Sequence, residues 1–145
     1  DKAFGELVQY FEKVPEKTII CMFGDHQPMF EEEGFYEQIY AQTDGLSETD
    51  KIFNQYKTPF IIWANYDIPE QDGIDISANY LGALLLETAG IPGNSFFNFL
   101  TKQMKAYPVI TVNGYKDNKG NAFQWSGEGT EFLDYRILQY YELFD

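Results

Sequence analysis

Hydrophobic positions in the first half of the chain follow two patterns, one with helical spacing and one continuous. Residues 1–13 carry apolar side chains three or four positions apart, which predicts an amphipathic helix that ends before Pro15. Residues 18–23 and 58–65 are short, continuous apolar runs. Such runs predict strands of a sheet that is covered on both faces, so we expect both strands to be fully buried.

The second half of the chain alternates between helical and strand patterns. The predicted elements are a helix over 79–89 between Ser77 as N-cap and Gly90, a helix from Asn94 or Ser95 to about Lys105, a strand over 107–112, short antiparallel strands at 115–116 and 122–125, and a closing helix over 130–144. Turn signals at Asn113-Gly114 and Asn118-Lys119-Gly120 separate the short strands.

The region between the two long strands gives weaker signals. Residues 31–33 are three glutamates, which indicate a solvated loop or helix start; a metal-binding carboxylate in this run has no further support. Residues 35–40 have a weak helical pattern, and residues 42–51 are polar and predict an exposed loop.

Composition and charge narrow the classes of function. The chain has 145 residues, of which 44% are hydrophobic, enough for one domain with a sizeable core. Its net charge of −13 repels phosphate backbones, so nucleic acid is excluded as an expected partner, and charge alone would not hold it on an anionic membrane. The single cysteine, Cys21, lies in an apolar strand and is interpreted as a small buried hydrophobe.

These patterns together predict an α/β fold. The sheet is expected to be buried and mainly parallel, flanked by helices, with a small antiparallel element near the carboxyl end. The sequence shows no repeat and no linker, so residues 1–145 are treated as a single domain or part of one.

The chemistry in the sequence concentrates at Gly24-Asp25-His26, directly after the first strand. His26 is the only histidine. A carboxylate oxygen and an imidazole nitrogen together suit a divalent cation such as Mn²⁺, Zn²⁺ or Mg²⁺, the last least favoured by imidazole. Gly24 would let the backbone leave the strand alternation so that both side chains reach one ion. The alternative is that Asp25 caps a turn and His26 is an ordinary imidazole.

Other catalytic constellations are absent from the sequence. One histidine and no nucleophile elbow exclude a Ser-His-Asp triad, and Gly24 stands alone, without a phosphate-binding glycine loop. Two ligands are also fewer than the three that catalytic metal sites usually have. The aromatic residues of 135–144 are interpreted as packing residues, with a carbohydrate-binding platform as the alternative.

Several segments occur in the order of a known family. They are Asp1–Phe11, the strand ending in Phe23-Gly24-Asp25-His26-Gln27-Pro28, Thr58–Trp63, Ser77–Leu81, Leu84–Gly90 and Tyr135–Phe144. In this order the chain resembles the carboxyl-terminal part of the sulfatase-like catalytic domain of the lipoteichoic acid synthase and phosphoglycerol transferase group. The resemblance covers nearly the whole chain.

The resemblance implies an alkaline-phosphatase-like sandwich and a metal site at the carboxyl ends of its strands. Asp25 and His26 would be metal ligands, commonly of Mn²⁺ in this group, joined by an acid and a threonine from earlier sequence. That threonine would be the nucleophile, taking glycerol phosphate from the anionic head group of phosphatidylglycerol and passing it to a glycan or glycolipid acceptor. Such proteins are anchored by amino-terminal transmembrane helices with the catalytic domain on the extracellular face of the bacterial membrane.

The chain departs from this family pattern in what it lacks. No residue here matches the nucleophile, the upstream acid or a substrate-binding histidine, so no catalytic or substrate-binding residue is assigned. We expect residues 1–145 to be the carboxyl-terminal segment of a larger catalytic domain, to need the upstream half as its partner, and to be inactive alone. The alternative is a non-catalytic envelope or interaction domain that retains the fold.

Overall fold

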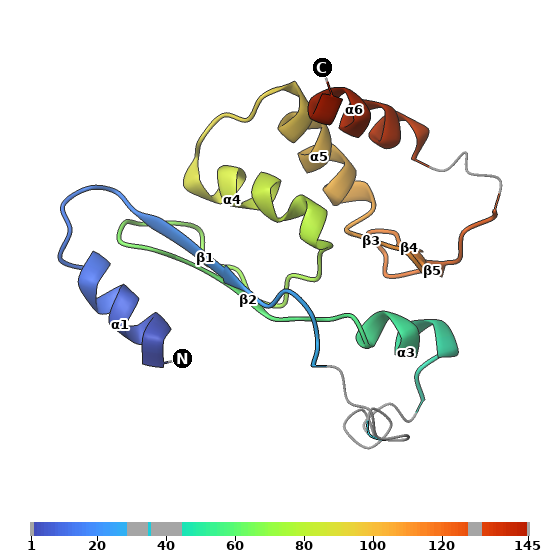
Figure 1. Ribbon diagram of the computed structural model, residues 1–145, viewed down its shortest axis with the longest axis horizontal. Helices are drawn as coiled ribbons and strands as arrows, with labels where there is room; N and C mark the ends of the chain where they lie inside the picture. The colour runs from blue at the N-terminus through green and yellow to red at the C-terminus, as the bar shows by residue number, and fades with distance from the viewer. Residues whose placement is uncertain (1, 29–34, 36–44, 128–131, 145) are drawn as a thin grey trace.

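The computed structural model describes residues 2–28, 35, 45–127 and 132–144 (Figure 1). The elements are, in chain order, α1 (Lys2–Phe11), β1 (Ile19–Phe23), α3 (Glu48–Asn54), β2 (Phe60–Ala64), a 3₁₀ turn η2 (Ala78–Tyr80), α4 (Leu81–Ala89), α5 (Ser95–Ala106), β3 (Val109–Thr111), β4 (Gly114–Lys116), β5 (Ala122–Phe123) and α6 (Leu133–Phe144). The predicted glutamate run at 31–33 lies outside the described residues, as does most of the weak helical pattern at 35–40.

Strands β1 and β2 form an antiparallel ribbon, with Ile19 opposite Ala64 and Phe23 opposite Phe60. The structure therefore corrects the expected mainly parallel sheet: among the described residues the sheets are this ribbon and the antiparallel order β3-β4-β5. The physical reason is that a continuous apolar run indicates burial but carries no information on strand direction. The small antiparallel element near the carboxyl end is confirmed.

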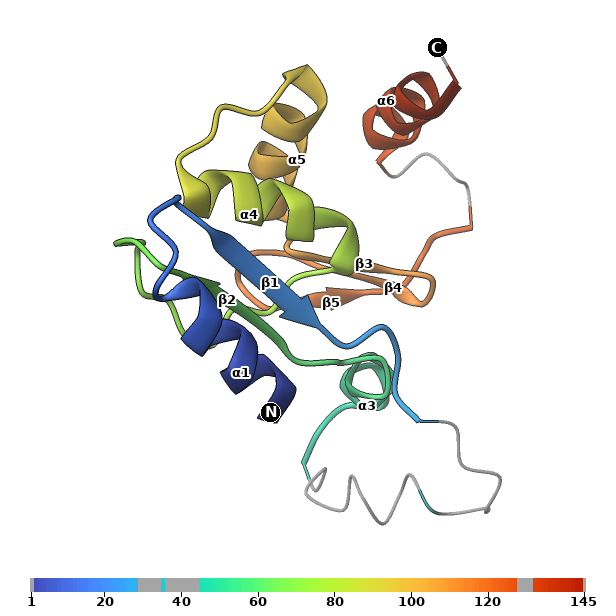
Figure 2. The same cartoon turned by 60° about the vertical axis from the view of Figure 1, so that its left-hand side comes forward.

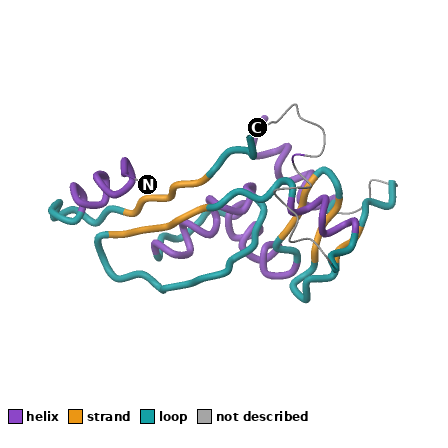
Figure 3. The backbone as a smooth tube through the Cα atoms, turned by 90° about the horizontal axis from the view of Figure 1, so that it is seen from below, coloured by secondary structure: helices purple, strands orange, loops and turns teal. Residues whose placement is uncertain are grey.

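The ribbon lies between two helical layers. Helix α1 lies on one side of it and α4 with α5 on the other, as the two views in Figures 1 and 2 agree. The tube in Figure 3 shows the two strands as a long pair beside these helices. The apolar core is on the α4–α5 side, where Phe60 and Ile62 of β2 pack against it.

Strand β1 is less buried than the sequence predicts. Its burial falls along the strand, and Phe23 is 57% exposed. The reason is that β2 alone carries the ribbon's contacts with the core, while β1 pairs with β2 and has no other strand beside it among the described residues. The site that follows β1 is therefore carried on an exposed strand end.

The core itself is built by η2, α4 and α5, the region that the sequence predicts as two helices. Its buried side chains are Tyr80, Ala83, Leu84, Leu100 and Met104. Helix α4 ends at Gly90, whose φ of 68° is the left-handed conformation that glycine tolerates. Helix α5 begins at the predicted Asn94 cap, whose side chain accepts a hydrogen bond from Phe97 N at 2.9 Å.

Two details of the helices differ from the sequence prediction. The polar segment predicted as a loop over 42–51 includes the start of α3, because Ser47 caps that helix by accepting from Asp50 N at 3.1 Å. Ser77 occupies the N-cap position of η2, but its hydroxyl bonds to Ile110 of β3 instead. Residues 42–44 lie outside the described part of the chain.

Helix α6 packs against α5 but buries none of its own residues. Tyr135 packs against the core, as the sequence predicts for residues 135–144, whereas Tyr140 and Tyr141 are 60% and 56% exposed. The reason is geometric, since neighbouring elements cover only one side of α6 among the described residues. In the described part of the chain, no helix is long and apolar enough to cross a membrane.

Candidate metal centre at the end of strand β1

The end of β1 is fixed by the segment that leads into β2. Gly24 N donates to Pro59 O at 3.0 Å, which continues the ribbon one residue beyond β1. Thr58 Oγ1 donates to Gly24 O at 2.8 Å. A Cβ on Gly24 would lie 3.0 Å from Thr58 Cβ, closer than side chains normally approach. A side chain at this position would therefore have to displace Thr58 slightly, and the φ of Gly24 is not positive.

Asp25 and His26 follow this anchored glycine and turn toward each other. Asp25 Oδ1 accepts from His26 N at 2.9 Å, and Asp25 Oδ2 lies 3.5 Å from His26 Nε2. The side chains of His26 and Asp25 are 75% and 81% exposed. A contact between side chains this exposed contributes little to stability, so holding the fold together does not account for the pair.

The imidazole of His26 is oriented by a second contact. Its Nδ1 lies 2.9 Å from Gln27 O, a backbone acceptor. When Nδ1 carries the proton and donates it there, Nε2 is left with a lone pair on the side facing Asp25 Oδ2. A metal-ligating histidine is commonly oriented in this way, because the N–H of its other ring nitrogen donates a hydrogen bond to a carbonyl oxygen.

The two atoms fit neighbouring positions around one cation. Ligands about 2.1 Å from an ion, at angles between octahedral and tetrahedral, lie about 3.0–3.4 Å from each other. The observed 3.5 Å between Asp25 Oδ2 and His26 Nε2 is close to this range. One hard oxygen and one imidazole nitrogen suit Mn²⁺ or Zn²⁺ better than Mg²⁺.

The described residues supply two ligands and not a complete site. No group of three or more His, Cys, Asp or Glu side chains that could hold a metal occurs within residues 2–28, 35, 45–127 and 132–144. The sequence prediction of two ligands, with the others elsewhere, remains a prediction.

Cys21 is not a candidate ligand or nucleophile. It faces Ile62 across the ribbon, and burial raises the pKa of its thiol. At neutral pH it therefore remains a thiol, consistent with its interpretation as a small hydrophobe.

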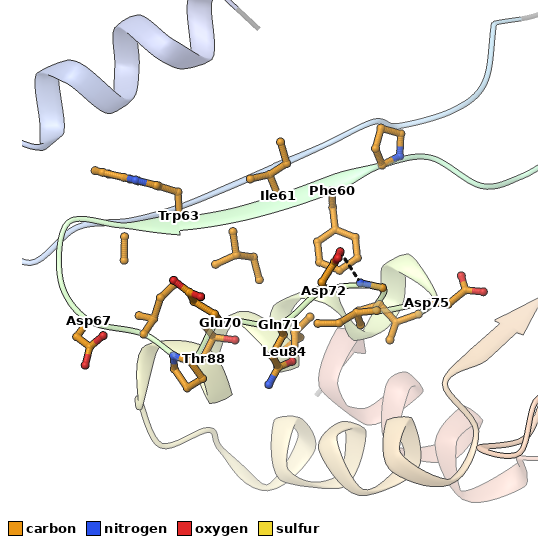
Figure 4. Close-up of a pocket in the computed structure, with 18 of the residues that line it drawn as sticks. Phe60, Ile61, Trp63, Asp67, Glu70, Gln71, Asp72, Asp75, Leu84 and Thr88 are labelled. Atoms are coloured by element: carbon orange, nitrogen blue, oxygen red, sulfur yellow. Dashed lines mark hydrogen bonds between the residues drawn. The ribbon is translucent and has the colours of Figure 1, made fainter.

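A groove of about 940 Å³ lies beside this site, between β2, the loop of residues 66–76 and α4. Figure 4 shows Phe60 pointing into it, while Ile61 and Trp63 point to the other side of β2. Its lining includes four acids, Asp67, Glu70, Asp72 and Asp75. Neither Asp25 nor His26 lines it; Thr58 and Pro59 do, so the groove meets the site only at that end.

Two side chains at the site were not singled out by the sequence. Thr58 holds Gly24, and Gln27 Nε2 donates to Lys57 O. Before Pro59 a threonine is an ordinary strand residue, so its sequence context gives no functional signal. Gln27 adjoins the Asp-His pair, and this adjacency is the one signal that could have drawn attention to it.

Comparison with known proteins places the chain in a family. The sulfatase family model matches residues 1–91, and the chain belongs to the sulfatase family. This matched region includes both strands of the ribbon and the Asp25–His26 pair. The sulfatase-like part of the resemblance is confirmed.

A curated relative extends the similarity over nearly the whole chain. It comes from Rhizobium meliloti (strain 1021), bears the name "Putative cyclic beta-1,2-glucan modification protein", and is 26% identical over 152 residues. The alignment covers 99% of this chain and 24% of the relative, so the chain spans about a quarter of that protein's length. No solved structure matches the chain.

Proposed function

We propose that the chain is the carboxyl-terminal segment of the catalytic domain of a metal-dependent phosphoester transferase or hydrolase, with Asp25 and His26 as two ligands of its cation. The observation that carries the proposal is the 3.5 Å approach of Asp25 Oδ2 and His26 Nε2 at the end of β1. Membership of the sulfatase family supports it. Strand β1 is partly exposed and pairs with β2 alone among the described strands, which agrees with a sheet to which sequence outside this chain adds strands.

The roles of this chain's own residues follow from the geometry. Asp25 offers one oxygen to the cation while its other oxygen accepts from His26 N. In the tautomer with the proton on His26 Nδ1, Gln27 O accepts that N–H and Nε2 is available as a ligand. When bound, a divalent cation would stabilise negative charge on phosphoryl oxygens and lower the pKa of a hydroxyl nucleophile. Mn²⁺ is the cation that the family resemblance favours.

The reaction we propose is transfer of phosphoglycerol from phosphatidylglycerol to a glucan. The resemblance to phosphoglycerol transferases suggests the donor, and the name of the Rhizobium relative, a glucan modification protein, suggests a glucan acceptor. A threonine outside this chain would take the group, and a glucan hydroxyl would then receive it. For this activity we propose that the complete protein works at the extracellular face of the membrane, held there by amino-terminal helices as the family resemblance implies.

The charge of the chain suits that arrangement. With a net charge of −13, this segment is repelled by an anionic lipid surface. Attachment would therefore depend on inserted helices and not on charge.

The test uses the complete purified protein with phosphatidylglycerol vesicles, cyclic β-1,2-glucan and Mn²⁺. Mass spectrometry should detect glucan carrying phosphoglycerol, with diacylglycerol released in equal amount. Chelation should stop the reaction. Free glycerol phosphate without modified glucan would instead establish a hydrolase, and no metal-dependent turnover of phosphodiesters would refute the proposal in favour of a non-catalytic domain.

A further inference from the structure

We propose that Thr58, together with Gln27, positions the two metal ligands by clamping Gly24–Gln27 from both ends. This four-residue segment is called the ligand arm below. The inference rests on the proposed function, because it assigns a role toward the cation that Asp25 and His26 would hold. It adds residues that lie outside the Gly-Asp-His motif.

Within the described part of the chain, hydrogen bonds tie both ends of the arm to the segment before β2. At the first end, Gly24 N donates to Pro59 O and Gly24 O accepts from Thr58 Oγ1. At the other end, Gln27 Nε2 donates to Lys57 O. All three partners belong to residues 57–59, directly before β2. The ligands between these ends are exposed and contact each other.

The Thr58 bond acts on the peptide group that orients Asp25. Gly24 O and Asp25 N belong to one planar peptide unit. The hydrogen bond from Thr58 Oγ1 to Gly24 O, at 2.8 Å, therefore fixes the orientation of this peptide plane. The peptide plane in turn sets the direction of the Asp25 side chain. The orientation of Asp25 also constrains His26, because the His26 backbone N–H donates to Asp25 Oδ1.

Gly24 and Thr58 approach each other closely. A Cβ at Gly24 would meet Thr58 Cβ at 3.0 Å and Cγ2 at 3.4 Å. The carbon atoms of Thr58 therefore occupy the space that a side chain at position 24 would need, while its hydroxyl bonds to Gly24 O. Thr58→Val keeps the branched shape and removes the donor, while Thr58→Ser keeps the donor and removes the methyl group.

A matched control exists in α5. Thr101 is also partly buried, and its Oγ1 donates to a backbone carbonyl, Phe97 O, at 3.0 Å. Thr101→Val thus removes the same kind of bond far from the arm. Gln27→Leu releases the other end of the arm and gives an independent test if Thr58→Val does not fold.

The measurement is Mn²⁺ affinity of the complete protein, from the electron paramagnetic resonance signal of free Mn²⁺, alongside turnover at increasing Mn²⁺. Residues that orient metal ligands typically contribute about 10–100-fold to affinity. Thr58→Val should weaken Mn²⁺ binding about 10-fold or more and Gln27→Leu by a smaller factor, while Thr58→Ser and Thr101→Val stay near the native value. Saturating Mn²⁺ should restore the turnover number of Thr58→Val.

The outcomes separate this inference from the proposed function. Native Mn²⁺ affinity in both Thr58→Val and Gln27→Leu would overturn the positioning role. So would a loss of turnover in Thr58→Val that saturating Mn²⁺ does not restore, because that indicates a purely structural role. If Asp25→Ala and His26→Ala also bind Mn²⁺ normally, the proposed function itself fails; if they lose Mn²⁺ while the Thr58 and Gln27 variants do not, only the clamp is wrong.

Discussion

The two halves of the molecule differ in how much they bury and in what they carry. The α4–α5 region contains most of the buried core, with Tyr80 fully buried and Leu100 only 3% exposed. The β1–β2 ribbon carries the Asp25–His26 pair, whose side chains are at least three-quarters exposed. The buried core and the candidate metal site are therefore located in different places, so substitutions in one region should leave the property of the other nearly unchanged.

The largest expected effect is on turnover, from replacing either ligand. Asp25→Ala or His26→Ala should lower metal-dependent turnover of the complete protein about 1000-fold, or about 4 kcal/mol, because a lost ligand costs more than the about 10–100-fold of a group that only orients one. The melting temperature should not change, since neither side chain is buried. Glu12→Ala, an exposed acid just after α1, is the charge-matched control. A lowered melting temperature in the Asp25 or His26 variant, with turnover lost because the protein unfolds, would contradict the separation of core and candidate site.

Replacing a core side chain with a smaller one should lower stability and leave Mn²⁺ binding unchanged. Leu100→Ala should lower the free energy of unfolding by about 2–5 kcal/mol, because it empties a packed site between α4 and α5. Urea denaturation measures this, with Leu143→Ala as the control, since Leu143 is 67% exposed in α6. The folded Leu100 variant should bind Mn²⁺ as the native protein does. Weakened binding would show that core and site are coupled.

A smaller effect is expected from replacing Asn65, whose side chain connects the end of α1 to the ribbon. The Asn65 side chain accepts from Thr18 N at 2.8 Å and donates to Phe11 O and Val14 O, both at 3.0 Å, and to Glu16 O at 2.9 Å. Asn65→Ala removes this partner from Thr18 N and Val14 O, while Phe11 O still accepts from Val14 N and Glu16 O from Thr18 Oγ1, so it should destabilise by about 2 kcal/mol. Hydrogen exchange should report faster exchange at residues 11–18. Unchanged protection there would show that α1 is held by other contacts.

The smallest effect concerns the ion pair that ties α3 to β4. Lys116 Nζ lies 2.7 Å from Asp50 Oδ1 and over the ring of Phe53. The hydrogen bond from Lys116 lowers the pKa of Asp50, followed by that from Ser47. Because the folded pKa is depressed, this stabilisation is present above the unfolded value near 3.9 and is lost as pH falls through the folded pKa.

Lys116→Met should therefore cost up to about 1 kcal/mol at neutral pH and nothing at low pH. Urea midpoints of variant and native protein, measured from pH 7 to pH 2, give the comparison. Asp117 also has a lowered pKa, from its bonds to Asn121, so only the difference between the two proteins isolates Asp50. A difference that persists unchanged at low pH would assign the effect to packing on Phe53.

The sequence was informative where local signals decide the structure. Gly90 and Asn94 mark the end of α4 and the start of α5 because a left-handed residue and a side-chain cap are local requirements. Strand direction was wrong, because β1 and β2 are joined through a long segment and an apolar run is equally compatible with either pairing. The exposure of α6 and Phe23 was also missed, because hydrophobicity predicts a need for burial and not the presence of a partner.

The candidate site could be predicted in part. The adjacency of Asp25 and His26 after a strand identified the pair, and their 3.5 Å approach fits that prediction without testing metal binding. The clamp could not be predicted, since Thr58 lies 34 positions from Gly24 and the contact exists only through the antiparallel pairing of β1 with β2.

The central claim, that His26 ligates the cation through Nε2, has a direct spectroscopic test. Electron spin echo measurements on the Mn²⁺-loaded complete protein detect nitrogen coupled to the metal by direct coordination. The native protein should show an imidazole nitrogen coupling that disappears in His26→Ala and persists in Glu12→Ala. An imidazole coupling that is unchanged in His26→Ala, or none in the Mn²⁺-loaded native protein, would contradict the claim.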